Sequence, residues 1–191
     1  MAELILASAS PRRKELLALT GLKFKIIPAK GDEVIHAPDP EGAVTELSIA
    51  KAKEVAAQAC DGDVVIGADT VVAFDGKILG KPHSKQQAFE MLEMLQGNMH
   101  QVYTGVCVIE KGKGIVASFA EHTSVYVVPM TSEEIREYIA TGEPMDKAGA
   151  YAIQGVFGKY ISKIEGDHNN VIGLPLARLW SYLKEYKEKL Q

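Results

Sequence analysis

An eleven-residue apolar run, Val64–Phe74, constrains the fold of this chain more than any other segment. Turn residues precede the run at 61–63, and the two-residue hairpin signal Asp75-Gly76 follows it. We therefore predict a long strand over 64–74 that turns back into a short strand at Lys77–Leu79. Asp69 interrupts the run, and a buried carboxylate without a partner or solvent costs roughly several kcal/mol. The run therefore predicts a strand with a polar site in its middle.

Two interpretations of Asp69 stay open from the sequence. Its carboxylate either forms a structural ion pair with an Arg or a Lys, or serves as a metal ligand or general base. Strict alternation along a strand places Asp69 and Thr70 on opposite faces. If both serve one site, the strand has to end or bulge near Gly67-Ala68.

The N-terminal segment predicts an anion-binding turn. An apolar run, Leu4–Ala7, leads through the polar segment Ser8–Lys14 into a helical pattern. Ser10 suits the N-cap and Pro11 the first helical position. Two arginines and a lysine in the first turn oppose the helix dipole, which is unfavourable without a bound anion. Hydroxyls, free N–H groups and guanidinium groups at a helix N-terminus together suit a phosphate. We interpret Lys14 as a solvated charge.

Composition excludes several classes of protein. The chain has 191 residues and a net charge of −4, which argues against a nucleic-acid polymer as partner. No apolar run reaches the ~18 residues of a membrane helix, and the N-terminus lacks the pattern of a signal peptide. Cys60 and Cys107 are both predicted to be small buried side chains in a reducing compartment. We therefore expect a cytoplasmic protein that binds no membrane. The five histidines are predicted to be on the surface or incidental.

The order of elements predicts an α/β protein, with a mixed sheet and helices on its faces, as a single domain over 1–191. Predicted helices include one from about Glu41 to Cys60 and one from near Pro175 to the C-terminus. Capping boxes are predicted where Ser84 precedes Gln87 and where Thr131 precedes Glu134. No linker separates two independent domains, and two lobes sharing one sheet remain open.

Four further residues stand out from their surroundings. Lys51 lies on the apolar stripe of its helix, and its ammonium either reaches the surface or points into a polar site. Lys81 lies on a stiff Gly-Lys-Pro loop, where it suits a phosphate. Gln154, in a Gly-rich stretch, offers both a donor and an acceptor to a nucleobase. Glu33 alone reads as a solvated loop residue.

Five segments, in order along nearly the whole chain, resemble the Maf family of nucleotide pyrophosphatases. They are Leu6–Arg13 (LASASPRR), Gly67–Val72 (GADTVV), Gly80–Pro82 (GKP), Asp146–Gly155 (DKAGAYAIQG) and Val171–Pro175 (VIGLP). The resemblance implies an inosine-triphosphatase-like α/β fold, in which helices flank a long mixed sheet and two lobes surround a deep cleft. It also implies hydrolysis of nucleoside triphosphates to a monophosphate and pyrophosphate, with a divalent metal cation, Mg²⁺ or Mn²⁺.

The resemblance assigns roles to the residues singled out above. Asp69 becomes the general base or a ligand of the metal, and Glu33 a candidate metal ligand. Arg12, Thr70 and Gln154 become readers of the base and match the subgroup similar to dTTP/UTP pyrophosphatases. The triphosphate is then held by Ser8, Arg13, Lys51 and Lys81.

Alternatives remain open at this stage. The chain could act on 7-methyl-GTP or another purine nucleotide, although the bulky aromatic typical of that subgroup after Ser-Pro is absent. It could also bind nucleotides without catalysis as a regulator of septum formation. The sequence leaves a homodimer open as well.

Overall fold

The computed structural model describes residues 2–190, and this part of the chain forms one seven-stranded mixed sheet in the order β2-β1-β3-β5-β6-β7, with β4 paired to β3. Strand β1 pairs in parallel with β2 and β3, whereas the β3–β4 and β6–β7 pairs are antiparallel. The strands are β1 (Leu4–Leu6), β2 (Lys25–Ile26), β3 (Val64–Phe74), β4 (Lys77–Leu79), β5 (Met99–Glu110), β6 (Gly114–Val127) and β7 (Ile161–Glu165). The α-helices are α1 (Pro11–Ala18), α2 (Pro40–Ala56), α3 (Lys85–Leu95), α4 (Ser132–Ala140), α5 (His168–Ile172) and α6 (Leu176–Leu183). The predicted mixed α/β sheet with helices is confirmed.

The chain divides into two compact units. The first unit holds the chain up to Asp69, the segment Thr104–Glu121 and the chain from Gly173 onward. The second unit holds Thr70–Tyr103 and His122–Ile172. Each of the long strands β3, β5 and β6 therefore contributes residues to both units.

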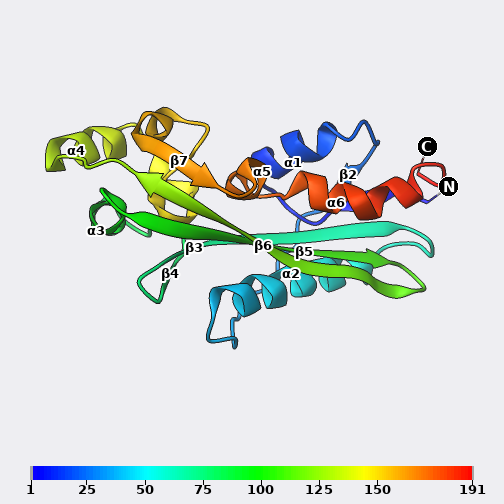
Figure 1. Cartoon of the computed structure of the whole chain (residues 1–191). Coiled ribbons are helices and arrows are strands. Elements are labelled where there is room, and N and C mark those ends of the chain that lie inside the picture. Colours follow the sequence, from blue (N-terminus) through cyan, green and yellow to red (C-terminus); the bar gives the residue numbers. More distant parts are fainter. Residues whose placement is uncertain (1, 191) are drawn as a thin grey trace. The chain divides into compact units, whose positions relative to one another are not determined.

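In the first unit, α2 covers one face of the sheet, and α1 and α6 cover the other (Figure 1). Helix α2 approaches the strands at two glycines. A Cβ on Gly67 would lie 2.3 Å from the carbonyl oxygen of Ser48, and one on Gly105 would lie 2.1 Å from that of Val44. Real side chains do not tolerate such distances, so these glycines allow backbone-to-backbone packing of α2 on the sheet.

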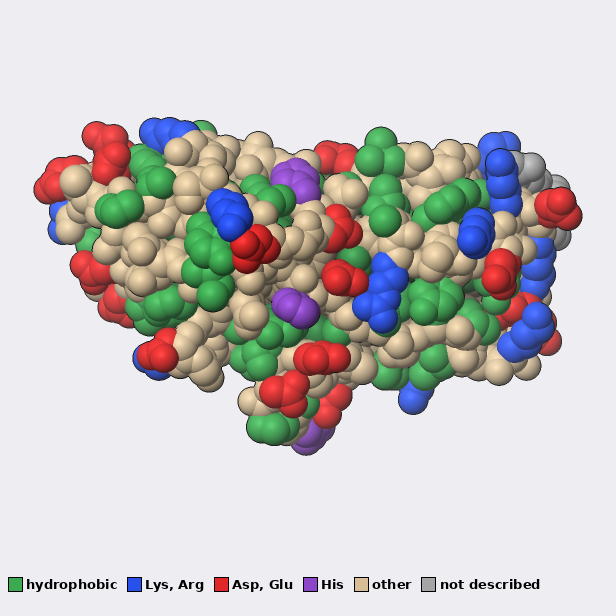
Figure 2. Space-filling model, in the orientation of Figure 1, with side chains coloured by type: hydrophobic (Ala, Val, Ile, Leu, Met, Phe, Trp, Pro, Cys, Tyr) green, Lys and Arg blue, Asp and Glu red, His purple; other side chains and the backbone are tan. Residues whose placement is uncertain are grey.

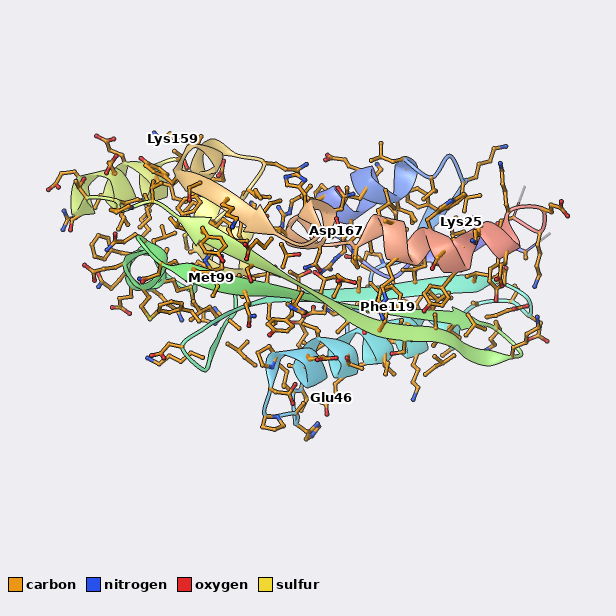
Figure 3. All side chains as sticks on the ribbon, in the orientation of Figure 1. Lys25, Glu46, Met99, Phe119, Lys159 and Asp167 are labelled. Carbon is orange, nitrogen blue, oxygen red and sulfur yellow. The ribbon has the colours of Figure 1, made fainter. Side chains whose placement is uncertain are left out.

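Helix α6 is fixed to β6 by aromatic contacts. Phe119, labelled in Figure 3, stacks on Tyr182 with ring centroids 5.5 Å apart, and the Arg178 guanidinium lies 4.4 Å from the Phe119 centroid. Leu179 and Leu183 are fully buried beneath the helix. This packing holds the C-terminal part of the first unit on the sheet.

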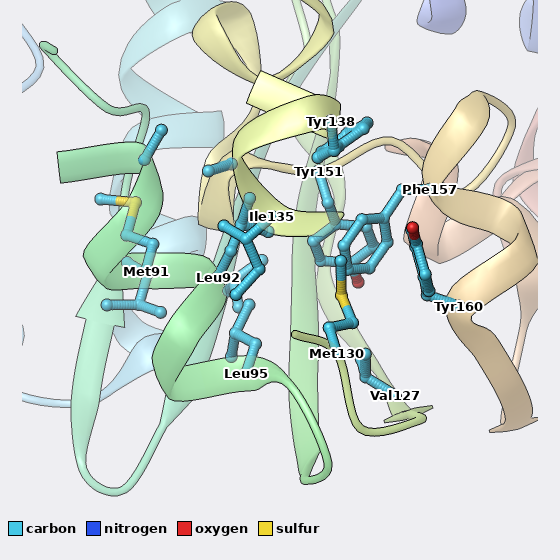
Figure 4. Close-up of a cluster of buried hydrophobic side chains, with 14 of the residues drawn as sticks. Met91, Leu92, Leu95, Val127, Met130, Ile135, Tyr138, Tyr151, Phe157 and Tyr160 are labelled. Carbon is cyan, nitrogen blue, oxygen red and sulfur yellow. The ribbon is translucent and has the colours of Figure 1, made fainter. Parts of the chain in front are cut away.

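The second unit has its own aromatic core. Tyr138, Tyr151 and Tyr160 surround Phe157, with ring centroids 4.9–5.6 Å from the Phe157 ring (Figure 4). Leucine and methionine side chains of α3 complete the cluster: Met91, Leu92 and Leu95. The Gly-rich stretch that contains Gln154 therefore packs on a close-packed hydrophobic core.

Most predicted elements are confirmed. Strand β3 covers Val64–Phe74 without interruption, so it does not end near Gly67-Ala68. Asp75 and Gly76 both have positive φ, at 48° and 71°, as a two-residue hairpin of type I′ requires. Ser10 caps α1 with Pro11 at its start, and Thr131 and Glu134 form the predicted capping box of α4.

Other predictions need correction. Helix α2 ends at Ala56 rather than Cys60, and α6 ends at Leu183, after which the chain tightens into a 3₁₀ turn. Ser84 caps α3, but the Gln87 side chain accepts a hydrogen bond from the N–H of His83 instead of closing the box. Helix α5 had no counterpart among the elements predicted from the sequence.

Two burial predictions were wrong in the same way, because each judged a side chain from its local pattern alone. Cys60 is exposed because α2 ends before it, whereas Cys107 is buried as expected. His100 is only 1% exposed, since β5 directs it toward Tyr151. Within residues 2–190, every helix is too short or too polar to cross a membrane.

Candidate functional site

Lys51 is the centre of a charged cluster in the first unit. Its ammonium lies 2.5 Å from Asp69 Oδ1 and 2.7 Å from Glu33 Oε1. The Lys51 side chain is 17% exposed, and those of Asp69 and Glu33 are 11% and 56% exposed. Of the two interpretations of Lys51, the structure shows the one in which it points into a polar site, and Asp69 forms an ion pair with it there.

The packing of α2 on β3 creates this cluster. Gly67 touches the helix backbone at Ser48 and Ala52, the residues that bracket Lys51. Asp69 follows Gly67 by two residues on the unbroken strand and therefore faces α2 as well. The close approach at Gly67 brings the helix near enough for the Lys51 ammonium to reach the Asp69 carboxylate.

The N-terminal turn adds a second group of residues in the same unit. Arg13 Nε donates to the carbonyl oxygen of Gly173 at 2.9 Å, and Arg13 Nη1 donates to Ser8 Oγ at 3.2 Å. Ser8 is buried directly after β1 and also accepts a hydrogen bond from the N–H of Ser10. Arg13 is thereby fixed in one orientation, while Lys14 is exposed as predicted.

Electrostatics link the two groups. Burial lowers the pKa of Arg13, and the Asp69 carboxylate opposes that shift. The charge of Arg12 adds to the lowering, and Glu33 opposes it. An arginine stays protonated through such shifts, so the site keeps positive charge beside two carboxylates.

Three predicted site residues belong to the second unit. Thr70 follows Asp69 on β3 and is half-buried, whereas Lys81 and Gln154 are exposed. The N–H of Gly149 donates to the carbonyl oxygen of Gly80 at 3.0 Å. This bond joins the loop of Lys81 to the Gly-rich stretch that contains Gln154.

The backbone on both sides of Gln154 is held by two partners, the buried Tyr138 and the half-buried Glu143. The N–H of Val156 donates to Glu143 Oε2 at 3.1 Å, and the N–H of Ala152 donates to the Tyr138 hydroxyl at 3.2 Å. That hydroxyl in turn donates to Glu143 Oε1 at 2.7 Å. These bonds fix the backbone of the segment while Gln154 itself projects into solvent.

Tyr151, which belongs to the same stretch, contacts the buried His100 of β5. His100 Nε2 and the Tyr151 hydroxyl lie 2.7 Å apart, and both side chains are buried. Burial lowers the pKa of His100 to about 4, so this histidine is neutral near pH 7. It therefore acts as a structural hydrogen-bonding partner and not as a titrating group at that pH.

Sequence reasoning missed Gly173, Glu143 and Tyr138 as supports of the site. Gly173 has a φ of 126°, which favours glycine, and its place in the segment VIGLP was the only signal for it. Glu143 and Tyr138 lie outside the motif segments, and nothing local marked them as partners of the Gln154 backbone.

Carboxylate oxygens are the donors that Mg²⁺ and Mn²⁺ prefer, and Glu33 and Asp69 bring two of them to one point. Among residues 2–190, no group of three or more His, Cys, Asp or Glu is arranged to hold a metal ion. A Mg²⁺ ion commonly uses only one or two carboxylates together with substrate phosphates, so this donor set fits such an ion.

A surface hollow of about 390 Å³ lies elsewhere in the first unit. Residues lining it include Lys53, Ile109, Glu110 and Ile115. None of the predicted site residues lines it, so it is separate from the charged cluster. We take the charged cluster as the candidate site.

Comparisons with known proteins identify the family of this chain. The family model described as "Maf: Maf-like protein" matches residues 3–186. A dTTP/UTP pyrophosphatase of Agathobacter rectalis is 48% identical over 97% of this chain and 98% of its own length. One from Geobacillus sp. strain WCH70 is 52% identical over 93% of this chain and 95% of its own length.

Solved structures resemble the chain at the level of fold alone. A HAM1 protein from Coxiella burnetii covers 97% of this chain and all of its own, with a TM-score of 0.53 and 17% identity. The Ham1 protein of Staphylococcus aureus has a TM-score of 0.51 at 16% identity, with the same coverage. The expected inosine-triphosphatase-like architecture is confirmed in this respect.

Proposed function

This chain belongs to the Maf family, and on that basis we propose that it hydrolyses dTTP and UTP to the monophosphate and pyrophosphate. Its relatives with that name match it at about half of all positions over nearly their full length. In this proposal the enzyme acts on nucleotides of the cellular pool, modified pyrimidine nucleotides among them. A cytoplasmic location and a homodimer remain predictions.

The observation that carries the proposal is the Glu33–Lys51–Asp69 cluster beside Arg13. A buried carboxylate next to fixed cations is what hydrolysis of a phosphoanhydride requires. A protein that only bound a triphosphate would gain nothing from a carboxylate there, because like charges repel. The cluster therefore favours catalysis over the non-catalytic regulator.

The chemistry follows from the atoms available. Water attacks the α-phosphorus, and its proton passes to Asp69 Oδ2, while Oδ1 keeps the bond to Lys51. The new bond joins the water oxygen to phosphorus. The bond that breaks is the one from the α-phosphorus to the bridging oxygen, which departs with the electron pair as part of pyrophosphate. Cationic side chains stabilise the charge that develops on the leaving group.

The remaining roles divide between phosphate and base. Ser8, Arg13, Lys51 and Lys81 hold the triphosphate in the proposed complex. Arg12, Thr70 and Gln154 hydrogen-bond to the pyrimidine, and Thr70 does so from the strand face opposite Asp69. Mismatched bases are rejected because polar groups that become buried against the bound base would stay unpaired.

A divalent cation completes the proposal. Glu33 and Asp69 would hold it, and when bound it supplies positive charge to the phosphate oxygens. The Lys51 ammonium stands between these carboxylates in the structure, so it and the cation share the task of neutralising them.

A product-resolved substrate panel tests the proposal. Purified protein is incubated with dTTP, UTP, dCTP, GTP and 7-methyl-GTP, each with Mg²⁺ or Mn²⁺, and products are separated by ion-exchange chromatography. We expect dTMP and UMP with pyrophosphate, and dependence on the metal. Preference for 7-methyl-GTP would favour the purine alternative, and binding of dTTP without cleavage would favour the regulator.

A further inference from the structure

The segment of residues 30–37, which contains Glu33, is fastened to α2 at its beginning. Glu54 of α2 accepts two backbone hydrogen bonds there. The N–H of Lys30 donates to Oε1 at 2.7 Å, and the N–H of Gly31 donates to Oε2 at 3.0 Å. A Cβ on Gly31 would lie 2.9 Å from Glu54 Oε2, so a side chain at this position would disturb the contact.

The end of the segment is fastened in the same way. Glu46, labelled on α2 in Figure 3, accepts from the N–H groups of His36 and Ala37 at 2.8 and 3.2 Å. These backbone bonds lower the pKa of Glu46, and those from Lys30 and Gly31 lower that of Glu54. Both carboxylates are therefore charged acceptors near pH 7, which strengthens the bonds.

Between the two attachments, apolar burial does not hold the chain. Val34 and Ile35 are 58% and 42% exposed. The segment lies on the protrusion at the bottom of Figure 2, where apolar, acidic and histidine side chains face solvent. Glu33 is also exposed, and it forms an ion pair with Lys51. Hydrogen bonds to α2, rather than packing, therefore determine where this segment lies.

We propose that Glu46 and Glu54 are positioning residues, which hold the segment 30–37 along α2 and so place the Glu33 carboxylate on Lys51 beside Asp69. Eight residues of helix separate the two attachments, a rise of about 12 Å. Lys51 lies between them on the same helix. One rigid helix thus presents both the attachments and the cation that Glu33 meets.

The role in catalysis rests on the proposed function, because Glu33 matters to the reaction only if this cluster is the reacting centre. Displacement of a catalytic group by about 1 Å can cost on the order of 100-fold in rate. The attachments are at the surface, so the N–H groups released by a substitution would bond to water. The loss should therefore appear in kcat rather than in stability.

The test is a double-mutant cycle on dTTP hydrolysis. We expect Glu54→Ala to lower kcat by about tenfold or more, and Glu54→Gln, which keeps one acceptor, to lower it less. In a Glu33→Ala background, Glu54→Ala should change kcat by no more than about twofold. The matched control is Glu41→Ala, an exposed carboxylate of the same helix, which should leave kcat unchanged.

Hydrogen exchange of the amides at 30–37 provides a second readout that does not need activity. Exchange should accelerate at least tenfold in Glu54→Ala and not in Glu41→Ala, at an unchanged melting temperature. Equal exchange in the two variants, or losses that add in the cycle, would overturn the positioning role. If the wild type fails to hydrolyse dTTP and UTP, the proposed function falls, and the exchange result alone decides the attachment.

Discussion

The two units hold their predicted functional residues in different ways. In the first unit the charged side chains hold one another, since Lys51 binds Asp69 and Glu33, and Arg13 binds Ser8. In the second unit Gln154 projects into solvent, and its flanking backbone is what Tyr138 and Glu143 hold. The first unit fixes charged side chains relative to each other. The second unit fixes only the backbone from which the accessible Gln154 side chain extends.

This difference suggests a division of tasks. Phosphoryl chemistry needs charges that are already in place, because reorganising them during the reaction is costly. Recognition of a base needs an accessible donor and acceptor on a rigid support. We therefore expect loss of the buried Lys51–Asp69 pair to affect turnover and stability together, and changes around Gln154 to affect selectivity.

Replacement of Lys51 should have the largest effect. Lys51→Met leaves the carboxylate of Asp69, a side chain that is 11% exposed, without its ionic partner, and this should lower the free energy of unfolding by about 3 kcal/mol. Turnover of dTTP should fall at least about 100-fold. Urea denaturation and steady-state kinetics measure the two effects. The double variant Lys51→Met, Asp69→Asn should regain stability but not activity; unchanged stability in the single variant would contradict the account.

Acid should distinguish the two units by the pH at which each loses stability. His100 has its folded-state pKa lowered by burial from 6.5 to about 4, so its contribution is complete above pH 6.5 and is lost as pH falls toward 4. The expected loss is about 3 kcal/mol. His100→Gln can still bond Tyr151 but does not titrate, and it should remove this part of the pH dependence in urea denaturation.

In the first unit the corresponding group is Glu110. Its hydrogen bond from Lys189 lowers its pKa from 4.5 to about 2, so its contribution is present above pH 4.5 and is lost between 4.5 and 2. A His100→Gln variant that still loses the same stability between pH 6.5 and 4.5 would contradict the assignment of that window to the second unit.

Tyr138→Phe should have a moderate effect, confined to the second unit. It removes the hydroxyl that joins Glu143 to the N–H of Ala152, at a cost of about 1–3 kcal/mol. The ratio of kcat/KM for dTTP over dCTP should fall, while kcat for dTTP changes less. Gln154→Ala is the matched comparison and should lower the same ratio. If Tyr138→Phe reduced kcat and left the ratio intact, the division of tasks would be wrong.

Lys14→Ala should have the smallest effect. Lys14 is exposed on α1, one residue beyond the fixed Arg13. Surface substitutions of this kind change stability by no more than about 0.5 kcal/mol, and turnover should stay within twofold. A large loss of activity would show that the basic turn acts through more than Arg12 and Arg13.

Local patterns were sufficient to predict much of the fold. Strand β3 and its hairpin were predicted at the observed residues, because a continuous apolar run and the turn signal Asp75-Gly76 act over a few neighbouring positions. The cap at Ser10 was predicted for the same reason. Cys60 was misplaced because the end of α2 depends on tertiary packing, which a local pattern does not contain.

The sequence was sufficient to single out Asp69 and Lys51, but not to predict the ion pairs and hydrogen bonds that join the residues of the candidate site. Asp69 and Lys51 stood out because a charge interrupts an apolar pattern, yet their pairing depends on Gly67 admitting α2 to the sheet. Glu33 had no local signal of its own, since in our proposal its place depends on hydrogen bonds that Glu46 and Glu54 accept from backbone N–H groups distant in the sequence. Long-range contacts of this kind cannot be read from spacing along the chain.

The most direct test of the central claim follows the products of dTTP in ¹⁸O-labelled water, with the wild type and Asp69→Asn side by side. The wild type should yield dTMP that contains one labelled oxygen, together with unlabelled pyrophosphate. The Asn variant should be folded and at least about 100-fold slower. Label in pyrophosphate, release of inorganic phosphate, or an Asn variant within tenfold of the wild type would contradict the role assigned to the cluster around Asp69.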